Sequence, residues 1–231
     1  MKNKFFYILA LIFFLPVKGL FWLNFIFFKI FPYYFRRTFI WNETNYKYSL
    51  INKVRSHYKI KNFVETGTYM GDTSLALSSY FENIFTVELN KKLYERSLKR
   101  LKKCDNVFCY NLSSEIFLKK IISKIKNQSI FFLDAHYSGP GTSKGSSTFS
   151  CLKELKEINK SKIKNHIIII DDISDFSSFE NNEKLSKIIS ALEKISKNYK
   201  FYFEYDMLFA IPDEKIHRQF NKEIIPHFLV R

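Results

Sequence analysis

The chain has 231 residues, of which 46% are hydrophobic, and it carries a formal net charge of +15 at pH 7. This length accommodates one α/β domain with a sizeable core, or two very small domains. The Lys and Arg residues lie along expected helix faces and do not form one block interleaved with aromatics, so the charge does not indicate nucleic-acid binding. Solvated helix faces account for the charge, and attraction to an anionic membrane surface is the alternative.

Residues 1–40 differ from the rest of the chain, because they contain six Lys or Arg residues, no acid, and mostly large apolar side chains. A continuous apolar run at residues 5–17 is followed by Lys18-Gly19 and by a second run, residues 20–28, that is apolar apart from Asn24. We expect residues 1–40 to be a membrane-attachment segment and residues 41–231 to be the globular domain. A cleaved signal peptide, which here lacks a small-x-small cleavage site, and a buried helical hairpin are the alternatives.

The remaining elements alternate along the chain. A helix is expected at residues 46–58, and short apolar runs predict strands at residues 62–65, 84–88, 106–110, 129–134 and 166–171, with amphipathic helical patterns between them. Two last apolar runs, at residues 201–205 and 207–211, are too close for a helix to connect them, so they must pair antiparallel. The fold class expected is α/β: a doubly wound, mostly parallel seven-stranded sheet with a C-terminal antiparallel strand pair, preceded by an apolar N-terminal helical segment.

The most informative motif follows the first expected strand. That strand ends in Glu65, and Gly67 and Gly71 then bracket a tight turn before a helical pattern begins. A strand, glycine turn and helix in this order present backbone N–H groups and a helix N-terminus to an anionic or polar ligand. Glu88 ends the next apolar run, where its carboxylate is placed to accept hydrogen bonds from the two hydroxyls of a ribose.

The pattern Glu65-x-Gly67-x-x-x-Gly71, the acid Glu88 and the closing antiparallel pair resemble the class I, Rossmann-like, S-adenosylmethionine-dependent methyltransferases, over roughly residues 46–212. The family's middle glycine is Tyr69 in this chain. In that family the glycine turn passes under the amino-acid part of S-adenosylmethionine. The resemblance implies that this cofactor is held by Glu65, Gly67, Thr68, Gly71 and Glu88, with Asp72 and Thr73 near its carboxylate and Ser113 and Ser114 near its adenine.

Candidate catalytic residues follow the fourth and fifth expected strands. Asp134 and His136 are two residues apart, so both can face one cleft, and Asp171 and Asp172 end the next strand. His136 is the candidate general base, with a metal ligand or a structural loop histidine as alternatives. The aspartates are expected to orient His136, to face the positive sulfonium, or to bind Mg²⁺ or Mn²⁺ with it, and helix capping is the alternative for the later pair.

Together these features predict a membrane-associated methyltransferase that acts on a hydroxyl of a glycan-type or other small acceptor. Its catalytic domain is expected to be cytoplasmic, because the cofactor is cytosolic, and its partners are the membrane surface and a small-molecule or lipid-linked glycan acceptor. A catalytically silent binding or scaffold domain and a nucleotide-sugar-processing enzyme are the alternatives.

Overall fold

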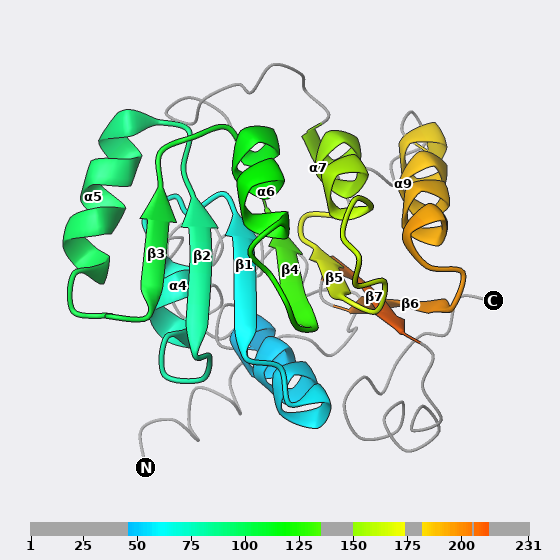
Figure 1. Ribbon diagram of the computed structural model, residues 1–231, viewed down its shortest axis with the longest axis horizontal. Coiled ribbons are helices and arrows are strands. Elements are labelled where there is room, and N and C mark those ends of the chain that lie inside the picture. The colour runs from blue at the N-terminus through cyan, green and yellow to red at the C-terminus, as the bar shows by residue number, and fades with distance from the viewer. Residues whose placement is uncertain (1–45, 135–149, 174–181, 205, 213–231) are drawn as a thin grey trace, which may run out of the picture. The chain divides into compact units, whose positions relative to one another are not determined.

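The computed structural model describes residues 46–134, 150–173, 182–204 and 206–212 (Figure 1). The chain divides into two units, Met1–Lys47 and Tyr48–Arg231. The expected membrane-attachment segment and His136 both lie outside the described residues. Within those residues, no helix has both the length and the apolarity needed to cross a bilayer.

The core of the second unit is one seven-stranded sheet in the order β3-β2-β1-β4-β5-β7-β6. Strands β1 to β5 run parallel, while β7 pairs antiparallel with both β5 and β6. The expected seven-stranded, mostly parallel sheet with the antiparallel pair at its end is confirmed, whereas the expected N-terminal helical segment lies outside the described residues. The strands are β1 Asn62–Thr66, β2 Asn83–Val87, β3 Val107–Tyr110, β4 Ser129–Leu133, β5 Ile167–Ile170, β6 Tyr199–Glu204 and β7 Met207–Pro212.

The central strands read as continuous apolar runs because helices cover both of their faces. Every residue of β4 and β5 is buried, with the sequences SIFFL and IIII. This is the pattern expected of parallel strands that are buried on both faces. Polar residues interrupt the pattern at Glu65 in β1 and Thr86 in β2, both of which are buried.

Two layers of helices sandwich the sheet (Figure 1). On one face, α6, α7 and α9 pack against side chains such as Val64 and Phe131, and on the other, α4 and the helix that ends at residue 58 pack against Phe63 and Phe132. The labelled helices are α4 Asp72–Leu77, α5 Lys91–Leu101, α6 Ser114–Ile122, α7 Ser150–Ile158 and α9 Asn182–Ile195.

The strand order creates a switch point between β1 and β4. The chain leaves β1 through α4 on one face of the sheet, whereas it leaves β4 through α7 on the other face. In open α/β sheets, ligands bind in the crevice that such a divergence opens at the carboxyl ends of the strands. Just beyond these two strands, the amide of Asp134 donates a hydrogen bond to the carbonyl of Thr66 at 3.0 Å, which fixes the floor of this crevice.

Candidate functional site

The loop between β1 and α4 has an unusual backbone. Gly67, Tyr69 and Gly71 all have positive φ angles, of 91°, 48° and 79° respectively. Glycine tolerates this region, whereas Tyr69 is strained in it. The Tyr69 side chain is 55% exposed, so its ring is not packed into the core.

The amides of this loop are used within the protein. The N–H groups of Gly67 and Thr68 both donate to the carbonyl of Val87 at 3.0 Å, and the N–H of Gly71 donates to the carbonyl of Thr68 at 2.7 Å. The loop is thereby tied to the end of β2 and closed on itself. The N–H groups of Gly67, Thr68 and Gly71 are therefore not available as donors to a ligand.

Glu65 is the buried anchor of the loop. Its carboxylate is 1% exposed, and Oε2 accepts hydrogen bonds from the hydroxyls of Ser74 on α4 and Thr86 on β2, each at 2.6 Å. Because the Thr86 hydroxyl donates to Glu65, the hydrogen bond of 2.6 Å between Thr68 and Thr86 has Thr68 as its donor. Glu65 therefore joins β1, β2 and the start of α4 beneath the glycine loop.

Burial dominates the electrostatics of Glu65. Desolvation raises the pKa of its carboxyl to about 7, although hydrogen bonds from Ser74, Thr86 and Thr73 lower it in part. Thr73 also hydrogen-bonds Tyr48, a residue of the helix that precedes β1. Burial raises the pKa of the Tyr48 hydroxyl to about 12, so this hydroxyl stays protonated at neutral pH.

Glu88 lies directly after β2 and faces the loop. Its Oε2 accepts the N–H of Tyr69 at 2.9 Å, and its Oε1 accepts the N–H of Asn90 at 2.8 Å. A carboxylate offers about four lone-pair sites, so about two remain after these bonds. Two oxygens held in fixed positions, each with acceptor capacity left, match the neighbouring hydroxyls of a ribose.

Asp72 and the two serines make contacts within the protein. Asp72 pairs with Arg100 of α5 at 2.5 Å, and Ser113 caps α6 by accepting the N–H of Ile116 at 3.4 Å. Ser114 hydrogen-bonds the buried carboxylate of Glu154 on α7. These contacts place Asp72 at the α4–α5 contact and both serines at the start of α6.

The candidate catalytic aspartates follow neighbouring strands. Asp134 follows β4 and Asp171 follows β5, and the N–H of Asp171 donates to the carbonyl of Leu133 at 3.1 Å. Asp171 is 5% exposed, and Asp172 has a positive φ of 51°. In the described part of the chain, no three His, Cys, Asp or Glu side chains are arranged to hold a metal ion.

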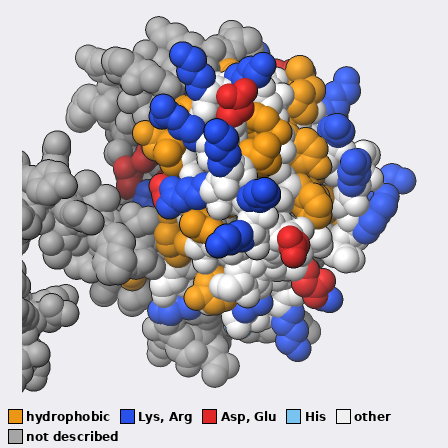
Figure 2. Space-filling model, turned by 90° about the vertical axis from the view of Figure 1, so that its left-hand side faces the viewer, with side chains coloured by type: hydrophobic (Ala, Val, Ile, Leu, Met, Phe, Trp, Pro, Cys, Tyr) orange, Lys and Arg blue, Asp and Glu red, His pale blue; other side chains and the backbone are white. Residues whose placement is uncertain are grey.

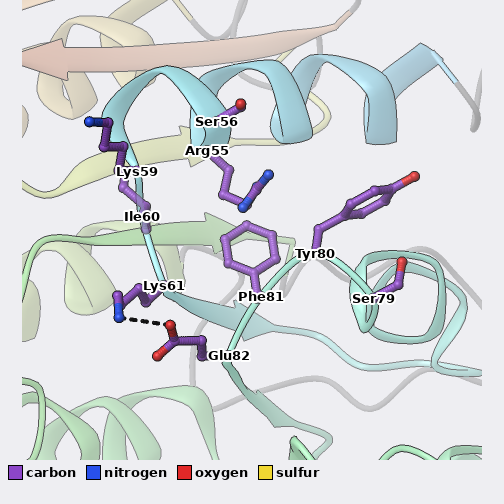
Figure 3. A pocket seen from close by; sticks show the side chains of 9 residues that line it. All are labelled: Arg55, Ser56, Lys59, Ile60, Lys61, Ser79, Tyr80, Phe81 and Glu82. Carbon is purple, nitrogen blue, oxygen red and sulfur yellow. Dashed lines mark ion pairs between the residues drawn. The ribbon is translucent and has the colours of Figure 1, made fainter.

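A separate cavity of about 390 Å³ lies at the opposite ends of the strands from the switch point (Figure 3). It is lined by Arg55 and Lys59 near the end of one helix and by Lys61 and Glu82, which pair at 2.7 Å and precede β1 and β2. This cavity is at the amino ends of the strands, so it is distinct from the switch point.

The face of the molecule that carries α5 is basic and partly apolar. Figure 2 shows Lys and Arg side chains spread over this face among apolar ones. Leu98 on α5 and Phe108 on the edge strand β3 are 45% and 42% exposed.

Several site residues were not among the sequence predictions. Thr86 and Glu154 had a visible signal, because each is a polar residue at an apolar position of its element: Thr86 in a buried strand and Glu154 beside Leu155 in the apolar stripe of α7. Ser74 and Tyr48 had none, since their roles depend on which side chains the fold brings beside Glu65 and Thr73.

Comparisons with solved structures identify the fold. An O-methyltransferase from Bacillus cereus, in complex with S-adenosylhomocysteine, is 12% identical, with a TM-score of 0.51, and the match covers 72% of this chain and 80% of that one. A Staphylococcus aureus protein assigned as a caffeoyl-CoA O-methyltransferase is 16% identical, with a TM-score of 0.53 and coverage of 72% and 83%. No family model matches the chain, and no match is found among curated proteins. The fold is that of the class I, Rossmann-like, S-adenosylmethionine-dependent methyltransferases.

Proposed function

We propose that this protein is an S-adenosylmethionine-dependent methyltransferase. The observation that carries the proposal is the position of Glu88, whose two oxygens are fixed by the amides of Tyr69 and Asn90 next to a strained glycine loop. The same fold binds S-adenosylhomocysteine in the Bacillus cereus O-methyltransferase. When bound, S-adenosylmethionine supplies a methyl group on a positively charged sulfonium.

The residues of this chain would bind and orient the reactants. Glu88 would accept hydrogen bonds from the ribose hydroxyls, while Glu65 and Thr68 keep the loop in shape from below. Asp134 and Asp171 would line the acceptor side of the crevice, since they follow β4 and β5. Methyl transfer requires alignment and removal of one proton, so few further groups are needed.

We propose that His136, two residues after Asp134 in the sequence, is the general base that removes this proton. The base would take the proton of an acceptor hydroxyl, with Asp134, Asp171 or Asp172 orienting the imidazole. His136→Ala should then abolish methyl transfer from labelled S-adenosylmethionine while the dissociation constant for S-adenosylhomocysteine stays within about twofold. An equal loss of affinity would instead place His136 in the cofactor site or in the structure.

The acceptor proposed is a hydroxyl of a glycan-type or other small molecule close to a membrane. Support comes from the sequence of residues 1–40, which is apolar and lacks acids. Labelled methyl groups should be found in the glycolipid fraction when the enzyme is incubated with a membrane extract. Carbonate washing of membranes should leave the full chain bound, and its complete release would contradict an integral attachment.

A divalent metal is a further proposal for the same site. Asp134 and Asp171 supply the carboxylate oxygens that Mg²⁺ and Mn²⁺ prefer, and they follow neighbouring strands. Treatment with EDTA should then lower the rate, and Mg²⁺ should restore it. An EDTA-insensitive rate would leave these aspartates with an orienting role alone.

A further inference from the structure

Glu154 is a buried acid whose hydrogen bonding is incomplete. It lies on α7 and is 1% exposed. Its Oε2 accepts a hydrogen bond from the Thr66 hydroxyl at 3.3 Å, and the Ser114 hydroxyl also hydrogen-bonds its carboxylate. Among the described residues, its Oε1 has no hydrogen-bond partner. Buried polar atoms are nearly always paired, so an orphaned carboxylate oxygen indicates that a partner is missing.

The three side chains converge at the switch point. Thr66 is the last residue of β1 and directly precedes Gly67, while Ser114 is the first residue of α6. Glu154 reaches them from α7, the helix through which the chain leaves β4. This cluster therefore borders the crevice in which ligands of such sheets bind.

The chemistry of the cluster favours a positively charged hydrogen-bond donor as the partner of Glu154. An ionised carboxylate only accepts hydrogen bonds, and the Thr66 hydroxyl already donates its proton to Glu154. Burial raises the pKa of Glu154 to about 7, because the hydrogen bonds from Ser114 and Thr66 only partly offset the loss of hydration. A ligand that brings N–H donors and a positive charge would supply the missing hydrogen bond and would also stabilise the buried negative charge.

The cofactor presents one such group in the right direction. A ligand whose ribose is held by Glu88, after β2, would reach the ends of β1 and β4 with one of its two ends, because β1 lies between β2 and β4 in the sheet. Of the two ends of S-adenosylmethionine, only the amino-acid end carries an ammonium group. We propose that Glu154, supported by Thr66 and Ser114, holds the α-ammonium group at the amino-acid end of S-adenosylmethionine. The assignment rests on the proposed function and adds a cofactor contact from α7, outside the glycine loop.

Calorimetric titration of the full chain with two ligands tests this assignment. S-adenosylhomocysteine carries the ammonium group, whereas 5′-methylthioadenosine has the same nucleoside and thioether without the amino-acid end. Glu154→Gln should weaken binding of S-adenosylhomocysteine about ten- to hundredfold, as expected for loss of a charge-assisted hydrogen bond, and leave 5′-methylthioadenosine within about twofold. Glu157→Gln is the matched control, because Glu157 is on the same helix with both oxygens already bonded to Lys160 at 2.5 and 2.7 Å.

Each outcome decides the assignment. Equal losses for the two ligands, or no loss for either, would overturn it and leave the proposed function standing if the wild type binds S-adenosylhomocysteine. No binding of either ligand by the wild type would overturn both proposals. If Glu154→Gln fails to fold, Thr66→Val serves as the second variant: it removes the hydroxyl that orients Glu154, and a severalfold loss confined to S-adenosylhomocysteine is then expected.

Discussion

The carboxylate of Glu88 accepts a hydrogen bond from the backbone N–H of Tyr69 at 2.9 Å. This bond joins the acid at the end of β2 to the middle of the glycine loop that follows β1. Tyr69 has a positive φ of 48°, so the bond also stabilises a strained residue of the loop. The shape of the loop and the position of the acid therefore depend on each other.

Replacing Glu88 should affect the affinity for the nucleoside part of the cofactor. Glu88→Gln keeps one carbonyl oxygen but loses the charge and one acceptor, so binding of both S-adenosylhomocysteine and 5′-methylthioadenosine should weaken about ten- to hundredfold in calorimetry. Glu95→Gln, an exposed acid on α5, is the control and should bind as the wild type does. Unchanged affinity in Glu88→Gln would remove Glu88 from the ribose site.

Gly71→Ala should destabilise the protein. Gly71 has a φ of 79°, and a Cβ atom there would lie 3.1 Å from Cδ1 of Leu101. The Leu101 side chain can shift slightly, so most of the cost comes from placing an alanine at a positive φ angle. We expect a loss of about 1–2 kcal/mol in the free energy of unfolding measured with urea. Ser79→Ala, an exposed position just after α4, should change it by less than about 0.5 kcal/mol.

The buried acid Glu65 should make stability fall as the pH rises. Its folded pKa of about 7 lies above the ordinary value of 4.5, so the folded state binds the proton more tightly than the unfolded state does. The resulting stabilisation is fully present below about pH 4.5 and is lost as the pH rises through 7, with a size on the order of 3 kcal/mol. Urea unfolding between pH 5 and 8 should show a smaller decline in Glu65→Gln than in the wild type. Parallel declines in the two proteins would contradict the pKa assigned to Glu65.

His166 should act in the opposite direction. It is fully buried, its Nδ1 accepts the N–H of Ser129 at 3.2 Å, and its Nε2 therefore donates to the hydroxyl of Ser161 at 2.9 Å. Burial lowers the pKa of His166 to about 4, with the charge of Lys164 adding to the effect. The unfolded state thus binds its proton more tightly, and stability on the order of 3 kcal/mol, present above about pH 6.5, is lost as the pH falls through 4. His166→Gln should unfold less steeply with acid over this range, and an unchanged acid transition would argue against a neutral buried imidazole.

The fold was predictable because most of its strands are short runs of consecutive apolar residues in the sequence. The sequence predicts both ends of each of the five parallel strands to within one residue. Strands that are buried on both faces form continuous apolar runs, such as Ile167–Ile170, whose ends are easy to recognise. The short spacing between the last two strands required them to be antiparallel, and β6 and β7 pair in this way.

The site was only partly predictable, because its hydrogen bonds join distant segments. The sequence indicated Glu65 and Glu88 as acids at strand ends, but it did not show that Glu65 is enclosed by Ser74 and Thr86. Likewise, the contact between Thr66 and Glu154 spans 88 positions of the chain and follows from the packing of α7, not from a local motif.

The most direct test of the account is a crystal structure of the full chain with S-adenosylhomocysteine. We expect the nucleoside at the carboxyl ends of β1 and β2, with both ribose hydroxyls within hydrogen-bond distance of the Glu88 carboxylate and the hydrogen bond from Tyr69 retained. A nucleoside bound elsewhere, or a Tyr69 ring occupying the space beside Glu88, would contradict the central claim.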